Sequence, residues 1–213
     1  MTTTRSGDAP RSRLRGVYAL IDPARCEPIA FTEAILRGGI RLVQVRAKGG
    51  IDAATLLGIV NRVRDAGGIA LLNDDVSLAR LADGVHLGQE DAAAFDLRQI
   101  RVALGDRIIG LSCGTPQEAR AADPALVDYL GVGPVFATGS KGDAGLPIGV
   151  SGVRAVVEAS ALPCAAIGGI TLATLRRVRE SGAAMAAVIS ALPTDAPEAA
   201  ARALVEAWGE SRA

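Results

Sequence analysis

The stretch Gly68-Ile69-Ala70-Leu71-Leu72-Asn73-Asp74-Asp75 joins a short apolar run to three polar residues, and a similar change follows soon after. There, Gly84-Val85-His86-Leu87 leads into Gly88-Gln89-Glu90-Asp91. Both apolar runs have the length and composition of buried strands. A carboxylate at the end of a buried strand is costly to desolvate unless a cation or a donor satisfies it. Asp74 and Asp91 are therefore candidate ligands of a hard cation such as Mg²⁺; solvated turn residues that cap the following helices are the alternative.

An apolar run followed by a segment of helical periodicity recurs eight times along the chain. The runs lie at 16–21, 41–45, 68–72, 83–87, 107–111, 127–132, 163–167 and 185–189, and a last helix is expected at about 195–208. Strands that alternate with helices pair in parallel through right-handed crossovers. Eight such units close a barrel, so we predict an α/β fold, a single-domain TIM (β/α)8 barrel over residues 16–213. A doubly wound open sheet is the competitor, but no Gly-x-Gly-x-x-Gly follows the first strand.

The composition narrows the classes of partner. Of the 213 residues, 49% are hydrophobic and 3% aromatic, which predicts an aliphatic core. The 23 basic residues equal the 23 acidic ones, a balance that argues against binding to nucleic acid or to a membrane surface. No apolar run approaches the roughly 18 residues of a membrane span. A phosphate ligand stays compatible with this charge, because backbone N–H groups at helix N-termini bind anions.

The cysteines and the first residues indicate the compartment. Cys26, Cys113 and Cys164 are odd in number and widely spaced, and no secretory signal precedes them. This pattern fits a reducing cytoplasm better than a disulfide framework. Residues 1–15 contain four arginines among Thr, Ser, Gly and Pro without an apolar segment, so we expect a disordered N-terminal tail there.

In a TIM barrel the chemistry lies at the carboxyl ends of the strands, and the end of the second strand is basic. It reads Gln44-Val45-Arg46-Ala47-Lys48. The alternation of a strand places Gln44, Arg46 and Lys48 on one face. An amide, a guanidinium and an ammonium on one face form an anion clamp, although two solvated cations at an exposed strand end are the other interpretation.

Near the end of the fifth strand we expect a polar contact rather than a nucleophile. Ser112 points from the strand end toward the barrel mouth and can donate to a substrate. Cys113 is interpreted as a small core residue, since nothing places the one histidine, His86, as a base beside it. His86 lies between two apolar residues and is expected to be packed with a satisfied hydrogen bond. Thr115 before Pro116 predicts a helix cap.

The remaining strand ends predict phosphate contacts. The connection 133–149 exceeds the usual length of a βα loop and carries Thr138, Ser140 and Lys141, which suits a lid over a phosphate group. Gly168-Gly169 after the seventh strand and Ser190 after the eighth stand where barrels often hold a phosphate.

Taken in order from about Tyr18 to Leu192, these strand ends resemble the thiamine phosphate synthase family. The matching segments are Gln44-Val45-Arg46-Ala47-Lys48-Gly49-Gly50, Asn73-Asp74-Asp75, 83–91, Gly131-Val132-Gly133-Pro134-Val135-Phe136, Thr138-Gly139-Ser140-Lys141, Ile167-Gly168-Gly169-Ile170 and Ile189-Ser190. The family usually has an acid where this chain has Ala47, Thr at Ser140 and His at Gly114. Ser140 keeps the hydroxyl, and the alternation places Ala47 off the anion-facing side.

The resemblance implies a function and a set of site residues. The family condenses hydroxymethylpyrimidine diphosphate with a thiazole phosphate, giving thiamine phosphate and diphosphate. By resemblance, Asp74 and Asp91 would hold Mg²⁺. The pyrimidine diphosphate would contact Gln44, Arg46, Lys48, Asn73, Ser112 and Lys141, and the thiazole phosphate would lie at Thr138, Ser140, Gly169, Ile189 and Ser190. The family mechanism is dissociative, so no residue is expected to act as a covalent nucleophile.

Three alternatives stay open on the sequence alone. The thiazole tautomerase branch of the same superfamily is an isomerase that needs no metal. A non-catalytic paralogue could bind thiamine phosphate or a precursor, an option that Ala47 and Gly114 keep open. An unrelated phosphate-binding barrel such as an epimerase is the third. The expected partners are small molecules, the pyrimidine diphosphate and the thiazole phosphate, and a homo-oligomer is compatible with the sequence.

Overall fold

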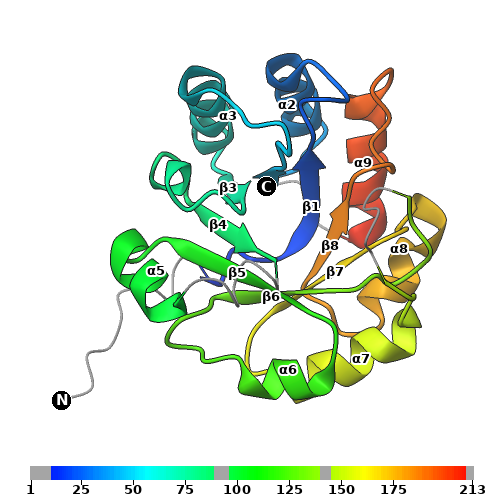
Figure 1. Cartoon of the computed structure of the whole chain (residues 1–213). Helices are drawn as coiled ribbons and strands as arrows, with labels where there is room; N and C mark the ends of the chain where they lie inside the picture. Colours follow the sequence, from blue (N-terminus) through cyan, green and yellow to red (C-terminus); the bar gives the residue numbers. More distant parts are fainter. Residues whose placement is uncertain (1–10, 89–95, 140–144, 210–213) are drawn as a thin grey trace.

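The computed structural model describes residues 11–88, 96–139 and 145–209. Parallel strands close into a barrel in the order of the sequence, β1 to β8 (Figure 1). They are β1 (Gly16–Ile21), β2 (Leu42–Val45), β3 (Ile69–Asn73), β4 (Gly84–Leu87), β5 (Ile108–Cys113), β6 (Tyr129–Val132), β7 (Cys164–Ile167) and β8 (Met185–Val188). Each lies within a residue or two of its predicted run, and the TIM barrel is confirmed.

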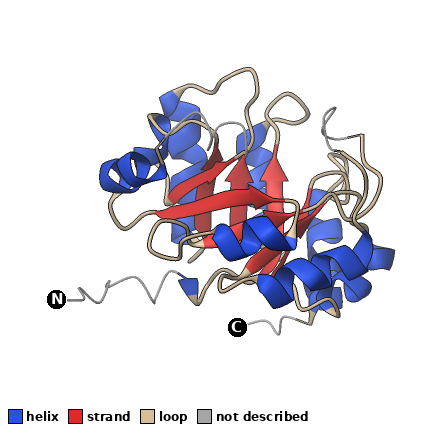
Figure 2. Cartoon of the chain, turned by 60° about the horizontal axis from the view of Figure 1, so that its bottom comes forward, coloured by secondary structure: helices blue, strands red, loops and turns tan. Residues whose placement is uncertain are grey.

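Helices surround the strands, as Figure 2 shows. They are α2 (Pro28–Arg37), α3 (Ala53–Asp65), α5 (Leu97–Leu104), α6 (Pro116–Ala121), α7 (Gly149–Ala159), α8 (Leu172–Arg179) and α9 (Pro197–Trp208). The connection from β3 to β4 contains only a 3₁₀ turn, η1 (Leu78–Arg80). Residues 74–83 are at the lower limit of about 10–12 residues for a complete crossover, which leaves room for only a short helical turn.

The strands read as continuous apolar runs because both of their faces are buried. In β1, Val17, Ala19 and Ile21 belong to the layer between the strands and the helices. Tyr18 and Leu20 point the other way and join the cluster that fills the barrel. This alternation has a period of two residues, so one strand supplies two cores.

Two glycines inside the barrel leave space for ring side chains. A Cβ atom on Gly110 of β5 would lie 2.2 Å from the ring of Tyr129, and one on Gly131 of β6 would lie 2.7 Å from the ring of His86. Neither approach is sterically tolerable. The rings of Tyr129 and His86 stack with their centroids 5.4 Å apart. An aliphatic barrel therefore encloses one polar, aromatic layer.

Asp128, at the start of β6, connects the N-terminal segment to the bottom of the barrel. Its carboxylate accepts hydrogen bonds from Arg11 Nε at 2.7 Å, Arg101 Nη2 at 2.6 Å and the backbone N–H of Ile109 at 2.8 Å. Leu14 is buried in the inner cluster. Contacts with the barrel thus begin earlier in the described chain than the predicted boundary at residue 16. The periodicity could not reveal this, because Arg11 and Leu14 precede the first strand.

We expect Asp128→Ala to lower the free energy of unfolding by about 3 kcal/mol. The substitution removes the carboxylate that pairs with two guanidinium groups and accepts from an N–H, although both guanidinium groups keep backbone carbonyl acceptors; breaking a buried ion pair costs roughly 3–5 kcal/mol. The lower end applies because part of the Arg11 side chain reaches solvent. Urea unfolding checks the value. Asp106→Ala, which removes an exposed carboxylate, is the matched control and should cost less than about 0.5 kcal/mol; equal costs would contradict this role of Asp128.

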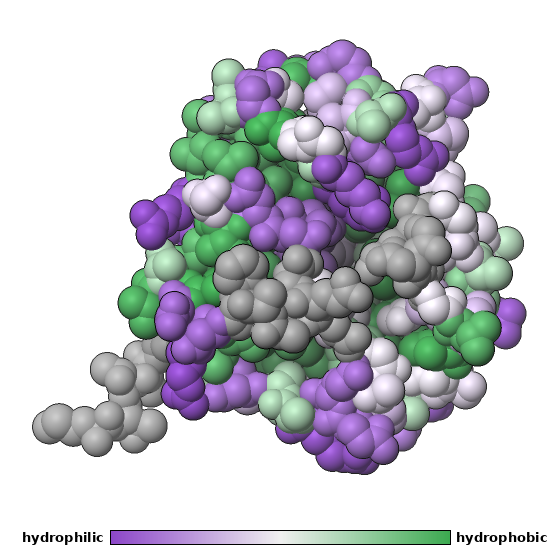
Figure 3. Space-filling view, viewed as in Figure 1, coloured by the Kyte–Doolittle hydropathy of each residue, from purple (hydrophilic) through white to green (hydrophobic). Residues whose placement is uncertain are grey.

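On the face shown in Figure 3, hydrophilic and hydrophobic residues are interspersed over the outer helices. Among the described residues, the large apolar side chains that stand exposed are Val102 on α5, Leu172 on α8 and Leu146 in the loop before α7. In the described ranges no helix is both long enough and apolar enough to cross a bilayer.

Candidate functional site at the carboxyl ends of the strands

The residues predicted from the sequence lie at one end of the barrel, where the strands finish. Gln44, Asn73 and Ser112 belong to the last residues of β2, β3 and β5, whereas Arg46, Lys48, Asp74, Thr138, Gly169, Ile189 and Ser190 follow the carboxyl ends of their strands. Asp91, Ser140 and Lys141 were predicted as well and lie outside the described residues.

The end of β2 places a positive charge in a buried position. Arg46 is only 8% exposed and Gln44 3%, whereas Lys48 is exposed. Within the described ranges the Arg46 guanidinium forms no ion pair and no hydrogen bond. Ala47 packs against the outer core, as the alternation predicted. A guanidinium stays charged at any physiological pH, and a buried charge is costly without a partner. The position is therefore suited to an anionic ligand.

Asp74 has an unusual backbone conformation at the end of β3. Its φ is 62°, and among the described residues it is the one residue other than glycine that has a positive φ. Its N–H donates to the carbonyl of His86 at 2.9 Å, and its Oδ1 accepts from the N–H of Gly88 at 3.1 Å. The amide of Asn73 donates to Oδ2. These bonds hold the carboxylate at the ends of β3 and β4. Asp tolerates the left-handed region better than most residues, at a cost of roughly 1 kcal/mol.

Asp75, by contrast, stabilises the turn that follows β3; the capping alternative concerns Asp74 and Asp91. Its Oδ1 accepts from the Ser77 hydroxyl at 2.6 Å and from the N–H of Leu78 at 3.0 Å. The hydrogen bond from the Ser77 hydroxyl, with the backbone bonds, lowers the pKa of the Asp75 carboxyl. This carboxylate starts the 3₁₀ turn η1 and belongs to the fold rather than to the site.

The described residues contain one of the two predicted metal ligands. Within residues 11–88, 96–139 and 145–209 there is no group of three or more His, Cys, Asp or Glu side chains that could hold an ion. The Asp74 carboxylate on the rim is an oxygen donor, and hard cations such as Mg²⁺ bind one or two carboxylates and complete their shell with water and substrate phosphates. A site of that type does not need a cluster of three protein ligands, so the donor chemistry fits Mg²⁺.

Below the rim, a chain of hydrogen bonds crosses the barrel interior. Gln44 Nε2 donates to the Tyr18 hydroxyl at 2.6 Å, and the Tyr18 and Tyr129 hydroxyls are 2.9 Å apart. Tyr129 OH lies 2.9 Å from His86 Nδ1, and His86 Nε2 lies 3.2 Å from Ser112 Oγ. The packed, hydrogen-bonded histidine predicted from the sequence is confirmed.

The two tyrosines of this chain were missed by the sequence reasoning. A signal existed, because Tyr18 and Tyr129 are the only tyrosines and both stand inside predicted strands of a chain with 3% aromatic residues. A buried tyrosine hydroxyl requires a hydrogen-bond partner. Two such residues in an aliphatic barrel indicate a polar interior layer, although not which side chains meet there.

Cys113 lies in the outer core rather than in the site. Its side chain is 3% exposed, and its Sγ donates to the carbonyl of Thr115 at 3.3 Å. Burial raises the pKa of the Cys113 thiol to about 11. At pH 8 only about one thiol in a thousand would be ionised, and the thiolate is the reactive form. The predicted cap beside it is confirmed, since Thr115 and Glu118 form a capping box on α6.

We expect Cys113→Ala to leave the turnover rate within about twofold of the wild type. The thiol has no chemical role in this site, and its removal costs only a small amount of stability, on the order of 1 kcal/mol. Initial rates of the reaction proposed below, together with alkylation by iodoacetamide at pH 8, check this. A tenfold loss of turnover, or alkylation of Cys113 faster than that of the half-buried Cys26, would contradict it.

The turns after β6 and β7 pack tightly against each other. The N–H groups of Val135 and Phe136 donate to the carbonyls of Ile167 and Gly168 at 2.8 and 3.0 Å. Gly169 has a φ of 63°, and a Cβ there would lie 2.5 Å from the carbonyl oxygen of Ala137. Glycine at this position is thus explained by the close approach of the segment that leads to Thr138.

After β8, the chain turns back over the barrel end. Ile189 packs against the inner cluster, and its carbonyl accepts from the N–H of Leu192 at 3.1 Å. Ser190 beside it is exposed. The turn presents a hydroxyl at the end of the barrel that also carries Arg46 and Asp74.

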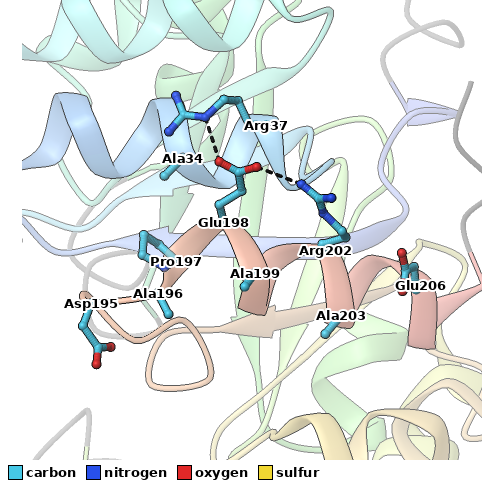
Figure 4. Close-up of a pocket in the computed structure, with 10 residues that line it drawn as sticks. All are labelled: Ala34, Arg37, Asp195, Ala196, Pro197, Glu198, Ala199, Arg202, Ala203 and Glu206. Atoms are coloured by element: carbon cyan, nitrogen blue, oxygen red, sulfur yellow. Dashed lines mark hydrogen bonds and ion pairs between the residues drawn. The ribbon is translucent and has the colours of Figure 1, made fainter.

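A groove on the outer wall, between α2 and α9, contains none of the predicted site residues (Figure 4). At its centre the Glu198 carboxylate accepts from Arg37 Nε and Arg202 Nη2, both at 2.8 Å. Surface ion pairs of this kind contribute little energy and no chemistry. The strand ends remain the candidate site.

The chain is similar to known proteins over most of its length. Residues 17–192 match the model of the family described as thiamine monophosphate synthase. A thiamine-phosphate synthase from Geobacillus kaustophilus is 44% identical over 187 residues, which is 83% of either chain. The bifunctional thiamine biosynthesis protein ThiM/ThiE from Symbiobacterium thermophilum is also 44% identical, over 92% of this chain and 42% of that longer protein.

A solved structure agrees with these sequences. The thiamine phosphate pyrophosphorylase from Pyrococcus furiosus superposes with a TM-score of 0.82 at 29% identity, covering 93% of this chain and 97% of that one. The strand-end residues that carried the resemblance lie within the matched residues 17–192, Asp91, Ser140 and Lys141 included. The chain therefore belongs to the thiamine monophosphate synthase family.

Proposed function

We propose that this protein condenses 4-amino-2-methyl-5-hydroxymethylpyrimidine diphosphate with 4-methyl-5-(2-phosphoethyl)thiazole. The products are thiamine phosphate and diphosphate, so the enzyme is a transferase of thiamine biosynthesis. Family membership supports the overall reaction. The side chains at the strand ends support the proposed course of this reaction.

The observation that carries the proposal is Arg46, a residue only 8% exposed whose guanidinium has no ion pair or hydrogen bond among the described residues. A charge that finds no partner among the described residues is retained at a cost, and a strongly anionic ligand offsets that cost. The planar guanidinium suits bidentate contact with a phosphate group. A diphosphate is the most highly charged part of either substrate, so we assign it to Arg46 and the exposed Lys48.

Mg²⁺ is the proposed cofactor, held by Asp74 and Asp91. When bound, it neutralises charge on the diphosphate and thereby makes it a better leaving group. Asp74 fits this role because three hydrogen bonds fix it where β3 and β4 end. Asn73, which donates to the Asp74 carboxylate, orients it and stands beside the same substrate group.

No protein nucleophile takes part in the proposed reaction. The bond between the pyrimidine methylene carbon and the diphosphate oxygen breaks first, and the electron pair leaves with diphosphate. The aminopyrimidine ring stabilises the resulting cation, and the thiazole nitrogen then donates its electron pair to form the new bond. The protein supplies charge complementarity and position. The described site residues are consistent with that division, since Cys113 is buried as a thiol and His86 lies below the rim.

The second substrate is assigned to the opposite part of the rim. Thr138, Ser140, Lys141, Gly169, Ile189 and Ser190 follow β6, β7 and β8, and Lys141 would also reach the diphosphate. Hydroxyl groups and backbone N–H groups at these ends suit a phosphate monoester. The two substrates would thus approach from different strand ends, which brings the thiazole nitrogen toward the pyrimidine methylene carbon.

The test is a coupling assay with purified protein, in which both precursors are present with Mg²⁺ or with EDTA. We expect thiamine phosphate only in the complete mixture with Mg²⁺. Turnover of a thiazole carboxylate phosphate tautomer in EDTA would instead identify the isomerase. Tight binding of thiamine phosphate without turnover would identify the non-catalytic paralogue, and either result would overturn the proposal. The three cysteines, free in the described structure, support the cytoplasm as the proposed location.

A further inference from the structure

The buried hydrogen-bond chain beneath the rim consists of Gln44, Tyr18, Tyr129, His86 and Ser112, in that order. Tyr18 and Tyr129 are 2% and 0% exposed, and Gln44 is 3% exposed. This row of hydrogen bonds therefore runs through the barrel core and ends at β5, where Ser112 is only half-buried. Its two ends, Gln44 and Ser112, are residues that the family resemblance predicts to contact the pyrimidine diphosphate.

Each hydroxyl in this row of hydrogen bonds has one hydrogen, so with a neutral His86 ring the protons can be ordered in only two fully satisfied ways. In the first, Gln44 donates to Tyr18, Tyr18 to Tyr129, Tyr129 to His86 Nδ1, and His86 Nε2 to Ser112. In the second order each bond is reversed: Ser112 donates to His86 Nε2, His86 Nδ1 to Tyr129, Tyr129 to Tyr18, and Tyr18 to Gln44. A mixed order leaves the Tyr18 hydrogen without an acceptor among the described residues, which is costly at a fully buried site.

The two orders differ in what Ser112 offers to a ligand. In the first order Ser112 Oγ accepts from His86, so its own hydrogen points away from the ring. In the second order Ser112 donates its hydrogen to His86 Nε2, so toward a ligand it can only accept a hydrogen bond. An anionic ligand requires the donor.

We propose that Tyr129 and His86 are positioning residues that turn the Ser112 hydroxyl into a hydrogen-bond donor toward the substrate. The amide nitrogen of Gln44 faces Tyr18, which selects the first order. His86 is then the neutral tautomer protonated at Nε2. Because the ligand of Ser112 is the pyrimidine diphosphate, the effect on the reaction rests on the proposed function; the tautomer itself does not.

Two further observations favour a fixed order. Burial raises the pKa of both tyrosine hydroxyls, so neither loses its hydrogen near neutral pH. Glycines at 110 and 131 clear space for the Tyr129 and His86 rings, where a Cβ would lie at 2.2 and 2.7 Å. The ring of His86 is thereby held between the Tyr129 ring and the backbone of β6, with its two nitrogens facing different partners.

The direct test is NMR of the full-length protein labelled with [ring-¹⁵N]histidine at pH 7.5. The chain has one histidine, so the spectrum contains a single ring. A long-range ¹H–¹⁵N correlation distinguishes Nδ1 from Nε2 by their couplings to the ring C–H protons. We expect a neutral ring protonated at Nε2. A ring protonated at Nδ1, or at both nitrogens, would overturn the proposal whether or not the coupling assay succeeds.

Two variants test which residue determines the tautomer of His86. Tyr129→Phe removes the hydrogen that Nδ1 accepts, and we expect a mixture of tautomers. Tyr18→Phe is the matched control, since it also deletes one buried hydroxyl but leaves Tyr129 able to donate to Nδ1. Its ring spectrum should keep the Nε2 form. An unchanged spectrum in Tyr129→Phe would refute the assignment of Tyr129 as the residue that sets the tautomer.

A double-mutant cycle connects the tautomer to the reaction. Tyr129→Phe should lower kcat/KM by about tenfold, as loss of one hydrogen bond to a charged group does. In the Ser112→Ala background the same substitution should change kcat/KM by less than twofold, because the hydroxyl it orients is gone. Equal losses in both backgrounds would show that Tyr129 acts on the rate by another route, such as packing, and would overturn the positioning role.

Discussion

Arg46→Ala is expected to lower kcat/KM of the coupling reaction by two to three orders of magnitude while the fold stays intact. The guanidinium stands at the end of β2 without a partner among the described residues, so its charge is available to the leaving diphosphate. A loss of about 3–4 kcal/mol in transition-state stabilisation corresponds to that factor. Arg46→Lys should recover only part of it, because an ammonium group cannot make bidentate contacts.

Stability separates a functional role of Arg46 from a structural one. Removal of a buried charge that lacks an ion pair should change the free energy of unfolding by no more than about 1 kcal/mol. Arg41→Ala is the matched control, since Arg41 precedes β2 at the opposite end of the barrel and its guanidinium donates to the carbonyls of Leu36 and Ile40. Its kcat/KM should stay near the wild-type value. If Arg46→Ala keeps full activity, the diphosphate is not bound there.

Asp74→Asn is expected to lower kcat/KM by on the order of a hundredfold or more and to weaken the dependence of the rate on Mg²⁺. The substitution keeps the size of the side chain and removes the charge that would hold the cation. Asn also tolerates a positive φ, so the backbone at 62° is retained and stability should change by less than about 1 kcal/mol. Asp74→Ala would be harder to interpret, since it adds backbone strain.

The adjacent residue provides the control for Asp74. Asp75→Asn weakens the cap of η1 and should cost up to about 1 kcal/mol of stability, with turnover retained. Rates at a series of Mg²⁺ concentrations and urea unfolding of both variants complete the comparison. Full activity of Asp74→Asn at every Mg²⁺ concentration would remove Asp74 from the metal site.

The sequence was sufficient for the architecture because each strand is buried on both faces. Runs such as 68–72 and 83–87 are typical of interior strands, and β3 (Ile69–Asn73) and β4 (Gly84–Leu87) begin one residue after each run begins. The carboxyl-end rule then placed Arg46, Asp74 and Ser112 at one end without any knowledge of distances. The periodicity of β2 likewise separated Arg46 from Ala47, which packs against the outer core.

What the sequence could not provide depends on contacts across the barrel. Tyr18 and Tyr129 are 111 residues apart and meet only because β1 and β6 enclose the same interior. Local patterns assign a residue to a face, but they do not say which side chain lies opposite. The same limit applies to Arg11, whose partner Asp128 lies 117 residues away, and to Asp74, whose positive φ follows from its bonds to β4.

The most direct measurement of the central claim is ³¹P NMR of one reaction mixture that contains the wild-type protein, Mg²⁺ and both precursors. We expect the pyrimidine diphosphate signals to disappear while free diphosphate and thiamine phosphate appear in equal amounts. Release of diphosphate without thiamine phosphate, or persistence of both precursors, would contradict it.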